Sequence, residues 1–459
     1  MPIHRLMPNV RQVIRDKDLN LLPNLLQGRK PVDLADMMTD LKPSEQVLVL
    51  HSLDRAVAQE TFQHLLPSTQ NHILEILSAE EAAALLDTMT PDDRTLLLEE
   101  APPESSEQLM QLLSPEKRVE SESLLKYPED SVGRLMTPRY LAVSPGWTVA
   151  QVFDFVRRHG AQSETLNVIY VVDEQGRLMD DIRMGQFLLA PLQARVSDLT
   201  DGRFVALDAS ADRETAVDVF MREDRTALPV VSTDGILLGI ITVDDVLDVA
   251  ADEATEDIHK IGGVQALEEP YMQIGLIQMV RKRAGWLTLL FLGEMLTATA
   301  MGYFEQEIAR AVVLALFIPL IISSGGNSGS QAATLVIRAL ALQQLELRDW
   351  WRVLHREALA GLTLGGILGA IGFLRIVLWS AYSDLYGPHW LLVAVTVATA
   401  LVGVVLWGTL TGSLLPFLLR RLGFDPATSS APFVATLVDV SGLILYFSIA
   451  ALILKGALL

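Results

Sequence analysis

The stretch TSSAPFVATLVDVSGLILYFSIAALIL, from Thr428 to Leu454, decides the fold class of this chain. It is long and apolar enough to cross a bilayer, which takes about 20 residues of helix. One carboxylate, Asp439, stands near its middle, and no lysine or arginine follows before Lys455. A charge at that depth costs about 3 kcal/mol or more unless it meets water, a partner or an ion. We therefore predict that Asp439 lines a path for cations.

Charge divides the chain into two halves. Half of the 459 residues are hydrophobic, yet the formal net charge is -20. From Val264 to the end, 12 basic and 11 acidic residues give a net charge of +1. The first 263 residues hold 24 basic and 45 acidic residues, a net charge of -21. The acidic half would repel the phosphates of nucleic acid, which argues against that partner and favours cationic ligands.

Composition also limits the sites and the location that we expect. The chain has no cysteine, so disulfides and thiolate metal sites are excluded. Met1 to Leu6 lack the apolar core of a cleaved signal peptide. The apolar runs begin only near Ala284, so we expect the N-terminal half to be cytoplasmic. The second half is expected to be a multi-pass domain of the cell (inner) membrane, in contact with the lipid bilayer.

The N-terminal region is predicted to be helical and repetitive. Helix starts at Pro43, Pro67, Pro91 and Pro115 recur every 24 residues or so, which is typical of helix pairs stacked into a superhelix. A proline at the first helical position suits each of these starts.

Two interpretations stay open for Asp92 and Asp93, which follow Pro91 at one helix start. They are either solvated acids of an interaction scaffold, or ligands that hold a cation against a neighbouring domain. Thr90 is expected to be the N-cap of the same helix.

A duplicated α/β pattern follows. Two β-branched runs around a turn occur at 168–178 and again at 228–241, which predicts two hairpins. The pattern resembles a tandem pair of CBS domains, which commonly bind adenine nucleotides. The signature Gly-x-x-Thr-x-x-Asp of that family is present as Gly239, Thr242 and Asp245. The resemblance implies ATP or another adenine nucleotide there, whereas a helix-capping box is the alternative for Thr242 and Asp245.

Acidic residues crowd the second copy of this pattern and its exit. Like charges at this density repel one another, and carboxylate oxygens are the preferred ligands of hard divalent cations. We expect a divalent cation to compact the cluster and its removal to let the acids separate. The acids are Asp212, Glu214, Glu223, Asp224, Asp244, Asp245, Asp248, Asp252, Glu253, Glu256 and Asp257.

Five apolar spans are predicted to follow the basic run Arg281-Lys282-Arg283. Basic residues mark cytoplasmic ends, so the N-terminus lies inside and the C-terminus outside. The spans are residues 284–304, 311–337, 358–382, 391–419 and 428–454.

The fold is thus expected to be multidomain: an all-α superhelical domain (1–130), an α/β tandem CBS pair (131–252), a connecting helix (253–283) and an α-helical transmembrane domain of five spans (284–459).

The second span contains an unusual run, PLIISSGGNSGSQ, from Pro319 to Gln331. One interpretation is close helix packing through Gly325 and Gly329. We favour the other, a loosened turn whose carbonyls face an aqueous path together with Asn327 and Gln331.

Two further acids are undecided. Glu294 lies inside the first span, where it either lines the path or pairs at a subunit contact. Asp425, at the mouth of the last span, is either a helix cap or a cation ligand.

The order of these parts resembles the MgtE-type family of magnesium transporters and channels over nearly the whole chain. The specific matches are residues 319–331, residues 425–442 and the motif ATEDIHK at 254–260. The resemblance implies a homodimer with a magnesium-conducting pore between its membrane halves. It also implies that the connecting helices plug this pore when cytosolic magnesium is high.

The resemblance assigns residues to two sets of magnesium ligands. Magnesium gives up its water reluctantly, so a pore needs only a few oxygens around the hydrated ion. The resemblance implies Asp439 and Asp425 as pore ligands, and the run in the second span adds Asn327, Gly325, Gly326 and Gln331. The regulatory set is Asp92, Asp93, Asp212, Glu214, Asp224, Asp245, Asp248, Glu253, Glu256 and Asp257.

Three alternatives compete with this function. The first is a transporter of another solute that is gated by adenylates at the CBS pair. The second is a magnesium sensor that signals without transport. The third, a membrane enzyme with Asp439 as general base, lacks a nucleophile, a second acid or a tight set of metal ligands nearby, so we do not expect an enzyme.

Overall fold

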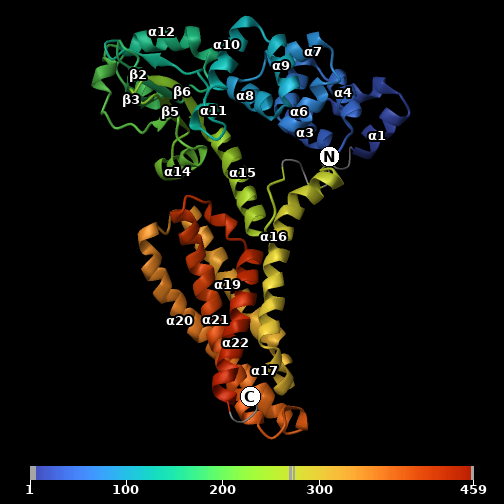
Figure 1. Cartoon of the computed structure of the whole chain (residues 1–459). Helices are drawn as coiled ribbons and strands as arrows, with labels where there is room; N and C mark the ends of the chain where they lie inside the picture. Colours follow the sequence, from blue (N-terminus) through green and yellow to red (C-terminus); the bar gives the residue numbers. More distant parts are fainter. Residues whose placement is uncertain (1–6, 268–270, 272–273, 456–459) are drawn as a thin grey trace. The chain divides into compact units, whose positions relative to one another are not determined.

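The computed structural model describes residues 7–267, 271 and 274–455. Two compact units make up the chain, Met1–Ala251 and Asp252–Leu459. Short helices and two small sheets form the first unit, and long helices form the second, as predicted (Figure 1).

Short helices build the N-terminal region, and their repeat is confirmed. Helices α4, α6, α8 and α10 begin at the four predicted prolines, 24 residues apart. Side chains such as Leu34, Phe62 and Leu86 are buried between them. The helices are α1 (Met7–Arg15), α2 (Leu22–Leu26), α3 (Pro31–Thr39), α4 (Pro43–Ser52), α5 (Arg55–Gln63), α6 (Pro67–Leu74), α7 (Ala79–Leu86), α8 (Pro91–Glu100), α9 (Pro103–Leu112) and α10 (Pro115–Leu124).

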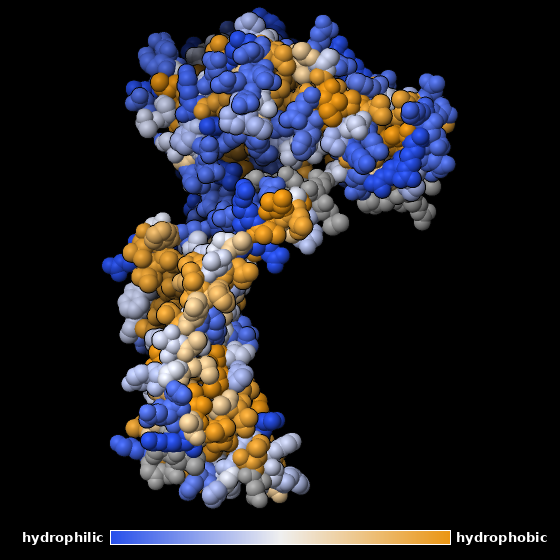
Figure 2. All heavy atoms as spheres, turned by 45° about the vertical axis from the view of Figure 1, so that its right-hand side comes forward, coloured by the Kyte–Doolittle hydropathy of each residue, from blue (hydrophilic) through white to orange (hydrophobic). Residues whose placement is uncertain are grey.

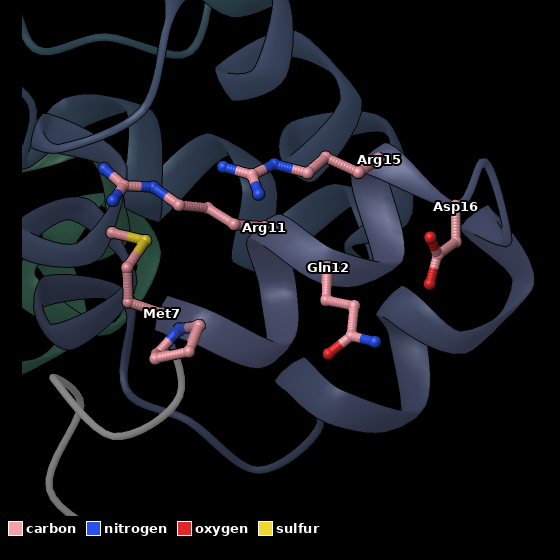
Figure 3. Close-up of a pocket in the computed structure, with 6 residues that line it drawn as sticks. Met7, Arg11, Gln12, Arg15 and Asp16 are labelled. Carbon is pink, nitrogen blue, oxygen red and sulfur yellow. The ribbon is translucent and has the colours of Figure 1, made fainter.

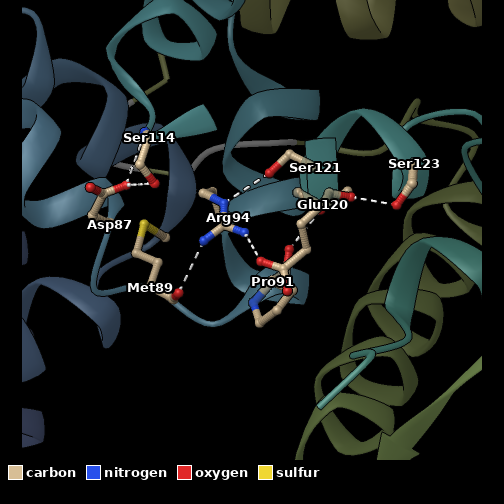
Figure 4. A network of polar contacts seen from close by, with 9 residues as sticks. Asp87, Met89, Pro91, Arg94, Ser114, Glu120, Ser121 and Ser123 are labelled. Carbon is tan, nitrogen blue, oxygen red and sulfur yellow. Dashed lines mark hydrogen bonds and ion pairs between the residues drawn. The ribbon is translucent and has the colours of Figure 1, made fainter. Parts of the chain in front are cut away.

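A fully buried arginine ties α8 to α10 (Figure 4). The guanidinium of Arg94 donates to Glu120 at 2.6 Å, to Ser121 at 2.8 Å and to the carbonyl of Met89 at 3.2 Å. A buried charge is tolerated only when it is paired and hydrogen-bonded, and these contacts supply both conditions. The network fixes the first turn of α8, which carries Asp92.

The duplicated α/β pattern forms two similar sheets. In each, a parallel pair is followed by an antiparallel hairpin, in the orders β1-β2-β3 and β4-β5-β6. The strands are β1 (Ala142–Val143), β2 (Val168–Val172), β3 (Leu178–Arg183), β4 (Leu207–Asp208), β5 (Ala227–Val231) and β6 (Leu237–Thr242). The accompanying helices are α11 (Val132–Leu135), α12 (Val149–His159), α13 (Met184–Leu189) and α14 (Arg213–Glu223).

The two hairpin turns pair with each other. Leu178 donates its N–H to the carbonyl of Gly235, and Leu237 donates to that of Gly176, both at 3.0 Å. Both glycines have positive φ, +80° and +79°, which their turns require. The two copies thus form one pseudo-symmetric pair.

The connecting helix starts earlier than expected. Helix α15 runs from Val243 to Ile261 without a break, so the predicted boundary at residue 253 falls inside it. The acid-rich sequence there is a good helix former, and the helix ends before Gly262 and Gly263, so it does not extend to residue 283 as expected. Part of the link to the first span, including residues 268–270, lies outside the described residues.

Five helices of the second unit are long and apolar enough to cross a membrane, as predicted. In Figure 2 apolar side chains cover much of this unit, whereas hydrophilic side chains cover most of the first. The spans are formed by α16 (Leu276–Tyr303), α18 (Val312–Ala315) together with α19 (Ile318–Ala341), α20 (Trp350–Ser380), α21 (Trp390–Arg421) and α22 (Ala431–Leu454). The short helix α17 (Glu305–Arg310) follows α16.

Glycines let α19 and α21 pack backbone to backbone. Gly325 and Gly329 of α19 are buried, and their carbonyl oxygens lie where a Cβ on Gly408 or Gly412 would stand. Helix α19 is continuous through this run, so the predicted loosened turn is wrong. The small residues serve close packing, which was the alternative interpretation.

We predict that Gly412→Ala destabilises the membrane unit, because its Cβ would overlap the carbonyl oxygen of Gly329. Overpacking of this kind costs about 1–3 kcal/mol. Thermal unfolding of the full chain in detergent measures the change. The control is Gly366→Ala on α20, where nothing lies within 4 Å of the added Cβ. Equal melting temperatures for both variants would contradict the packing assignment.

Candidate cation-binding sites

The carboxyl of Asp439 is half-buried near the middle of α22. Gly326 of α19 lies beside it, since a Cβ there would stand 3.7 Å from Oδ1 of Asp439. Among the described residues, no lysine or arginine forms an ion pair with Asp439. The acid is therefore not neutralised by a cationic side chain of its own chain.

The polar residues of α19 divide between two faces. Asn327 and Gln331 are exposed, four residues apart on one side of the helix. Gly325 instead packs on Val404 and Val438, so it does not fit the predicted role of a pore ligand. Helix packing occupies the space that a path would need there.

Asp425, just before the last span, forms an ion pair with Lys260. Nζ of Lys260 donates to Oδ2 of Asp425 at 2.7 Å and to Oε1 of Glu256 at 2.6 Å. The other oxygen of Asp425 accepts from the N–H of Ala427 at 2.8 Å, so this acid is also a helix cap. The ammonium group thus occupies the place between two carboxylates where a metal cation would bind.

Several acidic side chains surround Lys260 at the start of the last span, and their charges shift one another's pKa. Burial raises the pKa of Asp257, and the nearby charge of Asp425 raises it further. Burial alone would lower the pKa of Lys260, but its hydrogen bonds to Asp425 and Glu256 outweigh that effect and raise it. A divalent cation in place of Lys260 would be attracted by Glu256 and Asp425, the two acids that bond the ammonium group.

A second group of acids lies within the first unit, and we call this group the inner acidic cluster. It consists of Asp92, Asp93, Glu164, Asp244, Asp245 and Asp248. Its members come from the start of α8, the loop before β2 and the start of α15. Asp92 is only 8% exposed, which does not fit the interpretation as a solvated acid. Within the described part of the chain, its Oδ1 is buried without a hydrogen-bond partner.

Burial and mutual repulsion disfavour the ionised form of the carboxyls in the inner acidic cluster. Burial raises the pKa of Asp93 to about 6, and the charge of Asp92 adds to the shift. Burial likewise raises the pKa of Asp245 to about 8, again with a contribution from Asp92. The pKa of Asp92 itself is raised by burial. A cation in this cluster would relieve both effects.

The other predicted regulatory acids are dispersed. Asp212 caps α14 by accepting from the N–H of Glu214 at 2.9 Å, and Asp224 follows the last residue of the same helix. Eleven helical residues separate Asp212 from Asp224, so these two acids do not form one site. Glu253 lies on α15, between Asp248 and Glu256.

The Thr242–Asp245 pair forms the helix-capping arrangement. Oγ1 of Thr242 donates to Oδ2 of Asp245 at 2.6 Å, and the backbone N–H of Thr242 lies 3.4 Å from the same oxygen. A nucleotide bound here would have to share these groups with the cap.

Two further observations bear on metal binding. Among the described residues, no three His, Cys, Asp or Glu side chains are arranged closely enough to hold a bare metal ion. A hollow of about 590 Å³ along α1 is lined partly by Arg11 and Arg15 (Figure 3), which suits no cation. The candidate sites are thus groups of two or more acids suited to a hydrated ion.

Sequence reasoning missed Lys260 and Glu164. Lys260 follows Glu256 by four residues, a helical spacing that predicts their ion pair, but not the bond to Asp425. Nothing in the sequence around Glu164 indicates that it approaches acids from two distant helices.

Family models match three parts of the chain. Residues 318–449 match the model of MgtE, described as a divalent cation transporter. Residues 29–130 match the MgtE intracellular N domain, and residues 132–188 and 196–252 match the CBS domain.

Named relatives cover most of the chain. It is 39% identical to the magnesium transporter MgtE of Thermus thermophilus, over 98% of this chain and 99% of that one. It is 30% identical to MgtE of Bacillus subtilis, over 71% and 70% of the two chains. A crystal structure of the cytosolic domain of the Mg2+ channel MgtE in complex with ATP is 35% identical, with a TM-score of 0.50, and covers 53% of this chain and 99% of that chain.

The inner acidic cluster predicts a pH-dependent stability. An aspartate of the unfolded chain titrates near about 3.9, whereas Asp93 and Asp245 in the folded unit titrate at about 6 and about 8. The folded unit therefore keeps protons that the unfolded chain releases, and it loses stability as the pH rises through this range. We expect a fragment of residues 1–261, in chelator, to melt at a lower temperature at pH 8.5 than at pH 5. Calorimetry measures the transition.

The double variant Asp93→Asn and Asp245→Asn is expected to flatten this pH dependence, because both amides stay neutral. Asp234→Asn, at an exposed turn, serves as the control and should leave it unchanged. Magnesium at pH 8.5 should raise the melting temperature of the unmodified fragment. A double variant with the same pH dependence as the unmodified fragment would refute the assignment.

Proposed function

Because this chain belongs to the MgtE family of magnesium transporters, we propose that it conducts magnesium through a homodimeric pore whose opening is controlled by cytosolic magnesium. The single observation that supports this most strongly is the position of Asp439. Its carboxyl lies mid-span without a lysine or arginine partner among the described residues. In a bilayer such an acid is expected to serve a cation path.

The ion would pass Asp439 with its water shell. Magnesium keeps several waters and is commonly held through one or two carboxylates. A single carboxyl beside Gly326, with Asn327 and Gln331 on the same helix, supplies oxygens to such a shell. No tight cage of protein ligands is needed for a hydrated ion.

Two acidic groups would sense cytosolic magnesium. At the mouth, a divalent cation would displace Lys260 and draw Glu256 and Asp257 toward Asp425, which would hold the end of α15 over the pore. In the inner acidic cluster, a cation would satisfy the buried carboxyl of Asp92. Asp212, Glu214, Asp224 and Glu253 belong to this proposal as further, dispersed regulatory acids.

The CBS pair would add an adenine nucleotide as a second signal. A crystal structure of a relative's cytosolic domain is a complex with ATP. In this chain Thr242 and Asp245 lie at the corresponding signature, but they already bond each other. We propose magnesium as the main regulator and the nucleotide as a modulator.

The proposed location is the cell (inner) membrane, with the first unit in the cytoplasm. Basic residues at the start of α16 and the end of α21 support this orientation. A homodimer is supported by the resemblance to the family, and it would bring two Asp439 carboxyls to one pore.

The lead prediction is that Asp439→Asn lowers magnesium flux by on the order of tenfold or more, because the carboxylate contributes at least about 1.4 kcal/mol to ion passage. Flux into proteoliposomes measures the effect. Glu346→Gln, in a loop of the same unit, is the control and should transport normally. Normal flux through a well-folded Asp439→Asn variant would refute the proposed path.

A second prediction concerns closure. The double variant Glu256→Gln and Asp257→Asn is expected to need about tenfold more cytosolic-side magnesium for half-inhibition, because two of the acids facing the ion are neutral. Asp234→Asn is again the control. If the half-inhibiting concentration stays the same, these acids do not sense magnesium.

A further inference from the structure

Helices α16 and α22 run parallel and in register along most of their length. The contacts that set the register are a 3.0 Å hydrogen bond from the indole of Trp286 to Ser430, the packing of Gly293 on Thr436, and the stacked rings of Phe304 and Phe447, 5.1 Å apart. Residue numbers rise together on both helices, with the first pair 144 positions apart. This register places Glu294 next to the turn of α22 that carries Asp439.

The two carboxyls meet across the helix pair. Glu294 directly follows Gly293, which contacts Thr436, and Asp439 comes three residues after Thr436 on the facing helix. Gly293 makes this approach possible, since a Cβ there would stand only 3.0 Å from Cγ2 of Thr436. Small residues at such a contact let helices approach closely in a membrane.

In the part of the chain that the structure describes, Glu294 is a second acid without an ion-pair partner at the membrane depth of Asp439, and a bound cation would stabilise it. Among the described residues, no lysine or arginine forms an ion pair with Glu294, and Arg375 instead stacks on Trp379 of its own helix. Two carboxylates that face each other in a bilayer repel strongly, and a divalent cation relieves this repulsion where a monovalent cation does so only by half.

We propose that Glu294 is a second carboxylate of the permeation path, which contacts the water shell of the ion beside Asp439 and favours divalent over monovalent cations. The inference rests on the proposed function, since it takes Asp439 as part of the path. Glu294 acts on affinity and selectivity, while the α16 backbone positions it.

The first test is the Glu294→Gln variant in proteoliposomes. We expect the KM for magnesium to rise about tenfold, the preference for magnesium over sodium to fall, and the maximal rate per folded protein to change little. Glu294→Asp should restore most of the affinity, because it keeps the charge. Glu305→Gln, an exposed acid just beyond the same helix, is the control. An unchanged KM and selectivity in Glu294→Gln would overturn the inference.

A second test places either a negative or a positive charge at position 294 of the same folded variant. The chain has no cysteine, so Glu294→Cys introduces the one thiol. Water-soluble thiosulfonate reagents react only with a thiol that faces water. A reagent carrying a carboxylate should give about tenfold more magnesium flux than one of similar length carrying an ammonium group. Failure of both reagents to react, or equal flux with both, would overturn the inference even if Glu294→Gln does not fold.

Different results would refute the proposed function and the role of Glu294. If Asp439→Asn transports normally, the proposed function fails and Glu294 has no path to line. If Asp439→Asn is inactive while the Glu294 variants match the unmodified protein, only the role of Glu294 is lost.

Discussion

A carboxylate held in the middle of a membrane helix is the constraint on which this structure depends. Among the described residues no lysine or arginine forms an ion pair with Asp439, and in the proposed function water and a passing ion meet its charge. The surrounding helices fit that need. Gly326 brings the backbone of α19 beside the carboxyl, while Gly325 and Gly329 lock α19 to α21. Close packing on one side of α19 thus leaves its polar side chains free on another.

The same rule, that crowded acids attract a cation, applies to the acidic groups outside the membrane spans. At the mouth, the chain supplies its own cation, Lys260, between Glu256 and Asp425. In the inner acidic cluster the charge of Arg139 acts on Asp92, while burial raises the pKa of Asp93 and Asp245. A divalent ion would compete with Lys260 in the first group and relieve the repulsion of buried acids in the second, as the proposed sensing role requires. An internal lysine that competes with the ion would set the concentration at which the sensor responds.

Much of the fold followed from local patterns in the sequence. Prolines 24 residues apart marked four helix starts, β-branched runs around turns marked both hairpins, and apolar length marked five spans. The errors arose where distant segments decide the outcome. The glycines of α19 were interpreted as a loosened turn because their partner glycines on α21, about 80 residues later, are not visible in the local sequence. The two interpretations of Asp92 stayed open because burial by other elements cannot be read from a helix start. The bond from Lys260 to Asp425 and the approach of Glu294 to Asp439 depend on tertiary packing for the same reason.

The most direct measurement for the central claim is anomalous diffraction from crystals of the full chain grown with manganese, a divalent ion that scatters strongly and binds oxygen ligands as magnesium does. The account predicts a peak in a hydrated path beside Asp439, separated from the carboxyl by a layer of water. A map in which Asp439 faces lipid, with no metal peak at its level, would contradict it.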